Sequence, residues 1–419
     1  MRQILALLFS VTACQYERPR DVQPTDAGGD GRSSCREQPE ICVAPNATCV
    51  MDECRDCAVA NDHEADDCDV AGMQVCGTSN SCRPCRSDDE CNSAVCDGGV
   101  CLASANVIYV ALSGSGTGEC TQATPCSTLA QAVQRVSVAR AHVVMEHGAY
   151  VATGATTIDA RVTIHANEVV LERSTNGSIL DILGGDVTFL GGTFRNATGT
   201  GSADGITCAN GAALRLDSVT VDGNADRGIE VRDCTLQLTR VVISNNREGG
   251  LRLIDGSAVI SNAFVLNNGN SNTLNGGGIY LVPSVGGSRI EFSTFRRNAA
   301  TATAAGALGC AGWAADARNN LIFGSVNTPI EVQGTSCTHS YSIVGPLNAP
   351  PGIEIRSPTL AEVAFIDPNG NSAAASHLAT TSVARAAAEP ASATSIDFDG
   401  DTRPNPAGSR ADIGADEIP

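Results

Sequence analysis

A repeat of 22 residues in the middle of the chain limits the possible folds more than any other feature. Leu214 and Leu216 recur as Leu236 and Leu238, and the surrounding apolar positions shift by the same interval. A fixed period of this length is typical of a solenoid. Within each copy the apolar residues lie two apart, which is the periodicity of a strand with one buried face. Three short strands per copy predict one coil of a parallel β-helix.

An asparagine follows the middle strand of each copy. Asn tolerates the left-handed backbone conformation, and stacked side-chain amides can bond to one another along the solenoid axis. We therefore expect an asparagine ladder at Asn224, Asn246, Asn268 and Asn298, while Asn196 falls one residue out of register. The inward-facing core of two successive coils is expected at Leu216, Val221, Ile229, Leu238, Ile243 and Leu251.

Some coils are longer than others, and all the extra residues enter at one turn. These inserted loops are Ala197–Asp204, Asn267–Gly277 and Ala299–Gly306. Insertions at one turn of a solenoid lie on one face, which is often the binding face.

The first residues read as an export signal. One Arg and the apolar run Ile4–Val11 precede Cys14, a stretch too short to span a membrane as a stable helix. Val11-Thr12-Ala13-Cys14 resembles a bacterial lipobox, which implies a signal peptide at 1–13, lipidation of Cys14 and a polar tether at 14–34. The alternative is an ordinary signal peptide with an incidental cysteine. Two or three acyl chains would anchor the protein to the outer membrane or cell surface of a Gram-negative bacterium.

Composition agrees with export. The chain has 19 Cys, far more than a reducing cytosol favours, and 18 remain if Cys14 is lipidated. The net charge of −19 argues against nucleic acid as a partner. All 27 basic residues are Arg, so no Lys is available as a catalytic base.

Residues 35–101 contain twelve Cys and few large apolar residues, so disulfides must stabilise this module, at roughly 2–4 kcal/mol each. Cys54-x-x-Cys57 and Cys82-x-x-Cys85 could bind zinc, but the exported context and the even count favour disulfides. The string CRSDDECNSAVCDGGVC (85–101) resembles the small Cys-rich modules of myxobacterial surface proteins.

The next segment, VIYVALSGSGTGECTQATPCSTLAQAV (107–133), resembles the opening of many secreted bacterial β-helix proteins. Ser127 or Thr128 can cap a helix that carries apolar residues on one face, and this helix would cover the open end of the solenoid. Cys120 and Cys126 are expected to close the preceding loop. Further staples between neighbouring coils are plausible for Cys208 with Cys234 and for Cys310 with Cys337.

The β-helix is expected to occupy 102–375 and a closing segment 376–419. HLATTSVARAAA…IDFDGDTRPNPAGSRADIGADE (377–417) resembles the C-terminal signature of the same secreted β-helix proteins. Asp397, Asp399 and Asp401 alternate with other residues, a spacing that can wrap a calcium ion. The alternative is a solvated acidic turn that closes the fold, and no other cofactor is indicated.

The resemblance as a whole is to the pectate-lyase-like superfamily, which implies an all-β right-handed parallel β-helix and includes many enzymes of acidic polysaccharides. If the chain is such an enzyme, the candidate residues are Arg252 as base with Glu230 and Asp222. Glu230 and Arg252 occupy the same outward position one coil apart. A surface salt-bridge stripe is the alternative.

The sequence favours a surface lipoprotein that binds or adheres, with a polysaccharide or an envelope protein as partner and the lipid as its membrane contact. A polysaccharide lyase and a structural stalk are the alternatives. Turnover of polyuronates is not expected, because there is no Lys, no aromatic residue in the inserted loops and no registered carboxylate trio beside an Arg on one face. A compact Asp/Glu/Arg pocket on the inserted face would favour the enzyme, and a flat Asn/Thr/Gly surface would favour binding.

Overall fold

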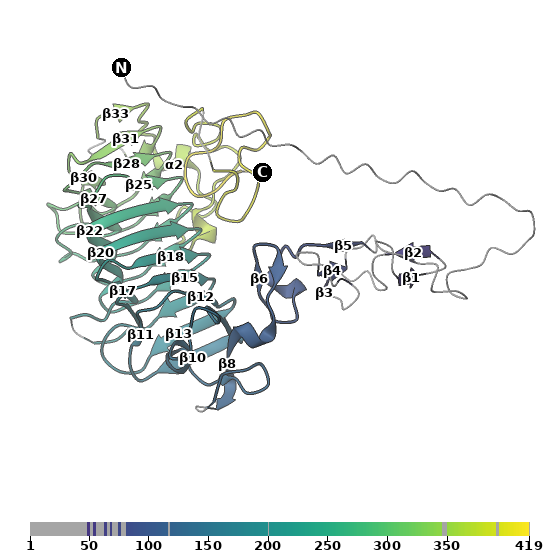
Figure 1. Ribbon diagram of the computed structural model, residues 1–419. Helices are drawn as coiled ribbons and strands as arrows, with labels where there is room; N and C mark the ends of the chain where they lie inside the picture. The colour runs from purple at the N-terminus through teal and green to yellow at the C-terminus, as the bar shows by residue number, and fades with distance from the viewer. Residues whose placement is uncertain are drawn as a thin grey trace, which may run out of the picture.

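The computed structural model describes residues 48–50, 53–55, 63–64, 68, 74–76, 81–115, 118–199, 201–345, 350–390 and 394–418. Its main body is an all-β parallel β-helix in which each coil contributes three strands (Figure 1). The predicted fold class is confirmed.

The coils stack into three faces, which we call sheets 1, 2 and 3. Sheet 1 consists of β11 (Thr156–Ile158), β14 (Leu180–Ile182), β17 (Ile206–Cys208), the first half of β20 (Arg227–Thr239), the first half of β22 (Gly249–Ser261), β24 (Ile279–Val282), β27 (Leu308–Cys310) and β30 (Val332–Gln333). Sheet 2 consists of β8 (Val107–Ser115), β9 (His142–Met145), β12 (Val162–His165), β15 (Asp186–Leu190), β18 (Ala213–Asp217), the second halves of β20 and β22, β25 (Arg289–Glu291), β28 (Ala315–Arg318), β31 (Cys337–Ser340) and β33 (Gly352–Ile353). Sheet 3 consists of β10 (Gly148–Ala152), β13 (Val169–Arg173), β16 (Thr193–Arg195), β19 (Thr220–Asp222), β21 (Val242–Ser244), β23 (Phe264–Leu266), β26 (Thr294–Arg296), β29 (Leu321–Phe323) and β32 (Ile343–Val344).

Sheets 1 and 2 form one hydrogen-bonded surface of 17 strands. The two 13-residue strands β20 and β22 run through both sheets, and their ladder passes around the corner between them. The chain turns there at Asp233 and Asp255, whose φ angles are 56° and 63°. Between sheet 3 and the next strand of sheet 1 lies the turn that receives all three inserted loops, as the sequence predicts.

The core fills the space between the three sheets. All six residues predicted to face inward are at most 1% exposed. Burial of each such side chain contributes roughly 1.5–3 kcal/mol, so the stacked rows are the main source of stability in the solenoid.

The predicted asparagine ladder is present and buried. Amide-to-amide distances are 2.9 Å for Asn224 to Asn246, 2.9 Å for Asn246 to Asn268 and 3.0 Å for Asn268 to Asn298. The left-handed residue of the turn is the one before each ladder asparagine, not the ladder asparagine itself. This explains Asn196, which has a φ of 63° and aligns with these left-handed positions, so that Ala197 takes the ladder place.

The predicted cap and staples are also present. α1 (Leu129–Val133) begins after Thr128, whose hydroxyl accepts a hydrogen bond from the Gln131 amide, and it packs against β8, β9 and β11. Disulfides join Cys120 to Cys126, Cys208 to Cys234 and Cys310 to Cys337. The last two pairs link neighbouring coils.

The Cys-rich module forms short elements held by disulfides. These elements are β1 (Thr48–Val50), β2 (Glu53–Arg55), β3 (His63–Glu64), β4 (Val75–Cys76), β5 (Cys82–Arg83), η2 (Asp88–Glu90), β6 (Cys96–Asp97), β7 (Val100–Cys101) and η3 (Ser104–Asn106). Disulfides connect Cys68 with Cys82, Cys85 with Cys96 and Cys91 with Cys101, so Cys82 and Cys85 are bridged rather than zinc-bound. Asp88 accepts a 2.6 Å contact from His165 of β12, which ties the module to the solenoid.

The C-terminal segment lies against one side of the coils (Figure 1). It begins at α2 (Leu360–Val363), before the predicted boundary at residue 376, and includes η4 (Ala374–Ser376). Its apolar residues form a second core with outward side chains of sheet 3 and its neighbours, such as Leu321 and Phe323. Sheet 3 is therefore covered over its later coils.

The predicted signal peptide (1–13), Cys14 and the tether (14–34) lie outside the described residues. In the part of the chain that the structure describes, no helix is both long and apolar enough to cross a membrane.

Candidate functional site

The outer face of sheet 1 carries a straight row of polar side chains. The ladder pairs Thr207 with Glu230, Glu230 with Arg252 and Arg252 with Tyr280, and the row continues to Asp181 at one end and Gly309 at the other. Because each of these residues pairs directly with the one on the next coil, the row runs parallel to the solenoid axis. Neighbouring strands in such a row lie about 4.8 Å apart. The predicted alignment of Glu230 with Arg252 is therefore correct.

Glu230 is the centre of the charged part of the row. It is 7% exposed, and its carboxylate lies 2.9 Å from Arg232 Nη2, 3.5 Å from Arg252 Nη1 and 3.6 Å from Arg227 Nε. Neither carboxylate oxygen accepts a well-directed hydrogen bond from the described residues. Glu230 is thus held by charge alone, by three guanidinium groups that are themselves partly exposed.

Two further carboxylates lie beside Glu230. Asp204, at the end of the first inserted loop, is 4% exposed and accepts a 2.9 Å hydrogen bond from the Arg227 amide. Burial raises the pKa of Asp204 to about 7, the Arg227 amide opposes this shift, and the charges of Asp226 and Glu230 add to it. Asp226 accepts a hydrogen bond from the Ser202 amide at 2.9 Å.

Of the carboxylates near Arg252, only Glu230 lies in the ladder row, so no registered trio is present among the described residues, but two others approach it from the turns. Asp204, Asp226 and Glu230 line one hollow together with Arg227 and Arg232. The face with the inserted loops holds a compact Asp/Glu/Arg pocket rather than a flat surface.

Asp222 does not join this pocket. It ends β19 in sheet 3, and its Oδ1 accepts hydrogen bonds from Ser244 Oγ and Asn245 Nδ2, both at 2.6 Å. The chain turns at Gly223–Asp226 before it enters sheet 1, so Asp226 rather than Asp222 reaches the pocket. Asp222 serves to join two coils.

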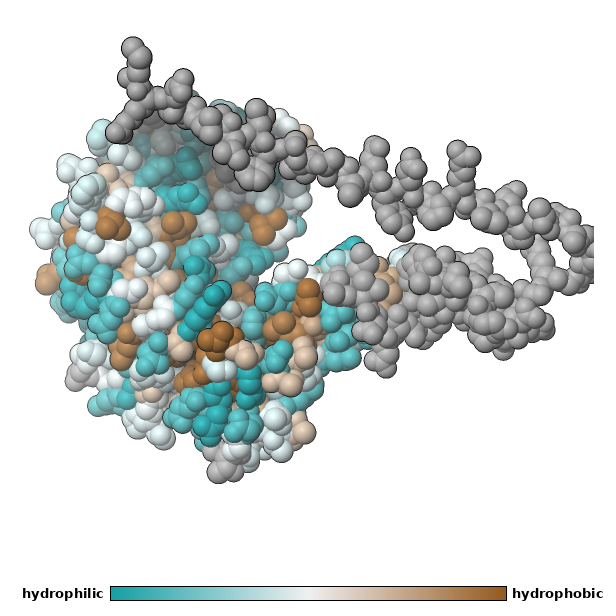
Figure 2. Space-filling model, in the orientation of Figure 1, coloured by the Kyte–Doolittle hydropathy of each residue, from teal (hydrophilic) through white to brown (hydrophobic). Residues whose placement is uncertain are grey.

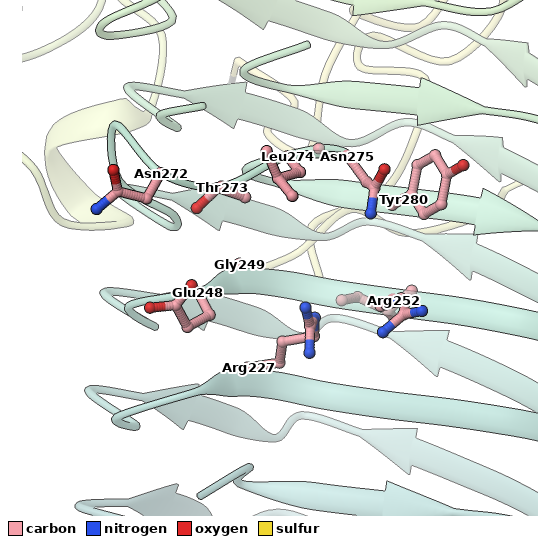
Figure 3. Close-up of a pocket in the computed structure, with 11 residues that line it drawn as sticks. Arg227, Glu248, Gly249, Arg252, Asn272, Thr273, Leu274, Asn275 and Tyr280 are labelled. Carbon is pink, nitrogen blue, oxygen red and sulfur yellow. The ribbon is translucent and has the colours of Figure 1, made fainter. Parts of the chain in front are cut away.

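A second hollow lies one coil further along and is lined by Arg227, Arg252, Thr273, Asn275 and Tyr280. Arg227 and Arg252 come from neighbouring strands, and Asn275 and Tyr280 from the next coil (Figure 3). Arg227 is shared with the carboxylate hollow, and Tyr280 is shared with a third hollow beside Gly309. The three hollows therefore follow one another as a groove along sheet 1.

Tyr280 is the aromatic group that sequence reasoning missed. It follows Ile279 as Arg252 follows Leu251, so the strand register places it in the row directly after the second inserted loop. A Cβ on Gly309 would lie 2.8 Å from Tyr280 Cδ2. The absence of a side chain at Gly309 thus leaves room for the Tyr280 ring to lie over the next strand. There the ring lies between two hollows of the groove, and it lines both.

The three candidate calcium ligands do not converge. Asp397 is fully buried and accepts hydrogen bonds from the amides of Asp399, Asp401 and Glu417 at 2.8–3.0 Å. Asp399 instead contacts His377, with 2.7 Å between Nε2 and Oδ2. Asp397 therefore builds a turn, but a buried one rather than the solvated acidic turn of the alternative interpretation.

The surface in the orientation of Figure 1 shows apolar side chains only in small groups among polar ones (Figure 2).

A comparison with family models matches residues 130–295 to a family described as the right handed beta helix region. Over these residues the chain is similar to right-handed β-helix proteins.

Among solved structures, the chain is similar to a crystal structure of the pectate lyase Pel9A, at 14% identity and a TM-score of 0.42. The alignment covers 75% of this chain and 96% of that one. No curated protein matches the chain.

Proposed function

We propose that this is an exported glycan-binding protein, and that the groove on sheet 1 holds an extended oligosaccharide bearing carboxylate groups. The observation that carries the proposal is the hollow between Arg252 and Tyr280. Arg252 makes one charge contact, at 3.5 Å, with Glu230, and its buried Nε–H donates no hydrogen bond within the described part of the chain. Its remaining donors can bind a planar carboxylate, which guanidinium groups recognise through paired hydrogen bonds.

Tyr280 supplies the apolar surface that sugar rings need. A tyrosine offers a large flat area at low conformational cost, and its position one coil from Arg252 lets one ligand touch both. Asn275 and Thr273, from the second inserted loop, add amide and hydroxyl groups along the same edge. The inserted loop thus forms one wall of the proposed site.

The test is binding of uronate-containing and neutral oligosaccharides on a glycan array, followed by titration calorimetry. Arg252→Met should weaken uronate binding about 10- to 100-fold, because a charge-assisted hydrogen bond contributes about 1.5–3 kcal/mol. Arg289→Met is the matched control, since Arg289 also projects from the 17-stranded surface and pairs with a glutamate, Glu291, at 3.4 Å. Equal effects of both substitutions, or binding of neutral glycans alone, would contradict the proposal.

A second candidate is cleavage of the bound glycan. The Asp/Glu/Arg pocket favours it, as the sequence criterion states, and so does Asp204 within that pocket. A carboxyl group with a pKa of about 7 can donate or accept a proton near neutral pH, which suits general acid–base catalysis. Arg252 is less suited to act as the base that the sequence suggested, because a guanidinium group has no acceptor atom available in its protonated form.

Cleavage is tested by ultraviolet absorbance for unsaturated uronates and by reducing-end release, with and without calcium. If the protein only binds, both assays stay at the level of a heat-killed control. Product release that disappears in Asp204→Asn while binding persists would establish the enzyme. Release that disappears in Arg252→Ala but survives Asp204→Asn would assign the base to Arg252.

We also propose that Cys14 carries the lipid that holds the protein at the cell envelope. The disulfides among the described residues support an oxidising compartment outside the cytosol. Cys14→Ser should move the protein from the membrane fraction to the soluble fraction. Retention of the variant in carbonate-washed membranes would refute the anchor.

A further inference from the structure

Three potential metal ligands meet in the C-terminal segment, on the opposite side of the coil from the groove. His377 Nε2 lies 2.7 Å from Asp399 Oδ2 and 3.8 Å from Asp416 Oδ1, and the three ligand atoms are all within 4.8 Å of one another. The residues come from three separate turns of the segment. Their convergence is therefore a product of the fold and not of sequence proximity.

The histidine is oriented as a metal ligand would be. Its Nδ1 lies 2.9 Å from the Ala373 carbonyl oxygen and 3.2 Å from that of Ala374. Carbonyl oxygens only accept hydrogen bonds, so Nδ1 carries the proton and donates it. Nε2 faces two carboxylates, which also only accept, so without a metal it carries a proton that it donates to Asp399 Oδ2. A bound metal would displace that proton and take the Nε2 lone pair. Metal-bound histidines commonly show this arrangement, with the distal nitrogen fixed by a carbonyl or carboxylate.

Asp416 provides an independent indication of a cation. Its side chain is about nine-tenths buried, and its Oδ2 accepts a 2.7 Å hydrogen bond from the Leu378 amide. Its Oδ1 belongs to the cluster and lies 3.8 Å from His377 Nε2, a charge contact longer than a hydrogen bond. Two carboxylates face one imidazole ring here, so a divalent cation would offset negative charge that the ring alone does not balance.

We propose that His377, Asp399 and Asp416 bind a divalent transition metal, with zinc the preferred ion. Metal–ligand bonds of about 2.0–2.2 Å in a tetrahedral site separate the ligand atoms by roughly 3.3–3.5 Å. The observed separations of 2.7 and 3.8 Å lie on either side of that value. Asp399 is the exposed member and can adjust, so the protein supplies three ligands and solvent supplies the fourth.

An imidazole ligand distinguishes this site from a calcium site, because calcium takes oxygen ligands almost exclusively.

The His377 ring packs on Phe264 of sheet 3, with 5.2 Å between ring centroids, and Phe264 in turn packs on Phe398. The bound ion would therefore fasten the turns around residues 377, 399 and 416 to one another over sheet 3. It would act as a clamp on the segment that closes the solenoid.

The test uses the full-length protein, freed of any affinity tag and treated with a chelator. Zinc, manganese and calcium are then titrated by calorimetry, and bound metal is counted by mass spectrometry. The proposal predicts one equivalent of zinc and a thermal midpoint that rises with zinc. Asp399→Asn, at an exposed position, should weaken zinc binding at least 10-fold, and His377→Gln should abolish it.

Asp401→Asn is the matched control, because Asp401 lies in the same turn but outside the cluster. It should bind zinc as the unaltered protein does. The proposal fails if the unaltered protein binds no zinc at micromolar concentration, or if binding survives Asp399→Asn. It also fails if calcium alone raises the thermal midpoint and Asp401→Asn removes that effect.

Discussion

Sheets 1 and 3 are built from the same repeat, yet they hold buried carboxylates in opposite ways. On the sheet 3 side, under the C-terminal segment, Asp397, Asp412 and Glu417 each accept at least two backbone N–H bonds. On sheet 1, Glu230 is 7% exposed, accepts no hydrogen bond from the described residues and is paired with guanidinium groups. Carboxylates bound to backbone amides cannot change partners without unfolding, whereas a carboxylate among Arg side chains can share them with a ligand.

This difference separates the two charged regions by role. The C-terminal signature, which contains Asp397, Asp412 and Glu417, forms the interior of a structural cover. The groove has fewer charges, but they line connected hollows and are open on one side. The following substitutions test this assignment.

The largest effect is expected for Arg403→Met on the covered side. The side chains of Arg403 and Glu417 are both fully buried and lie 3.3 Å apart, and the guanidinium stacks 4.4 Å from the Phe292 ring centroid. Removal of Arg403 leaves Glu417 as a buried unpaired charge, which costs about 3–5 kcal/mol. Urea unfolding measures the loss, with Arg385→Met as an exposed control. A loss below 1 kcal/mol would contradict a structural role.

A somewhat smaller loss is expected within the ladder. Asn246 donates to the Val221 carbonyl and to Asn268, and its Oδ1 accepts from the backbone and side chain of Asn224. Asn246→Ala leaves several buried groups without partners and should lower the free energy of unfolding by about 2–4 kcal/mol. Gln237→Ala, at an exposed position of β20, should change it by less than 0.5 kcal/mol. Similar losses for both would mean that the ladder is not essential.

A pH-dependent effect is expected for Asp204 in the groove. Its folded pKa of about 7 exceeds the ordinary value of 3.8, so the folded state binds a proton that the unfolded state releases. The free energy of unfolding should therefore fall as the pH rises from about 4 to 7. Asp204→Asn should remove this slope and stabilise the protein by about 1–3 kcal/mol at pH 8, after allowance for solvent in the groove. An unchanged slope in urea unfolding from pH 4 to 8 would show that another group titrates.

The smallest effect is expected for ligand binding at Tyr280. Tyr280→Ala should weaken glycan binding about 5- to 10-fold, because an aromatic contact contributes roughly 0.5–1.5 kcal/mol beyond buried area. Gly309→Ala should have a similar effect with the ring intact, since its Cβ would lie 2.8 Å from Tyr280 and 2.6 Å from the Asn275 carbonyl oxygen. Trp313→Ala, outside the groove lining, is the control. Titration calorimetry that finds Tyr280→Ala and Trp313→Ala alike would refute a stacking role.

The sequence predicts the regular part of this molecule well, because a stacked coil converts spacing directly into position. The ladder, the inward rows and the alignment of Glu230 with Arg252 all follow from the 22-residue step. Tyr280 follows from the same register once it is counted from Ile279 rather than sought inside the loop.

Other features depend on irregular paths that periodicity does not determine. Asp204 reaches the groove because the first inserted loop folds back to the Arg227 amide. The cluster of His377, Asp399 and Asp416 depends on how a segment without regular strands crosses sheet 3. For such residues the sequence gives chemical type but not location.

The central claim is that the groove of sheet 1, and not the covered side, binds the ligand. Hydrogen–deuterium exchange with a uronate hexasaccharide tests this most directly, because it maps protection along the whole chain. We predict slower exchange in peptides that contain 204–208, 227–232 and 272–281, and unchanged exchange in 377–416. Protection confined to the C-terminal segment or to the Cys-rich module, with no change in 272–281, would contradict the account.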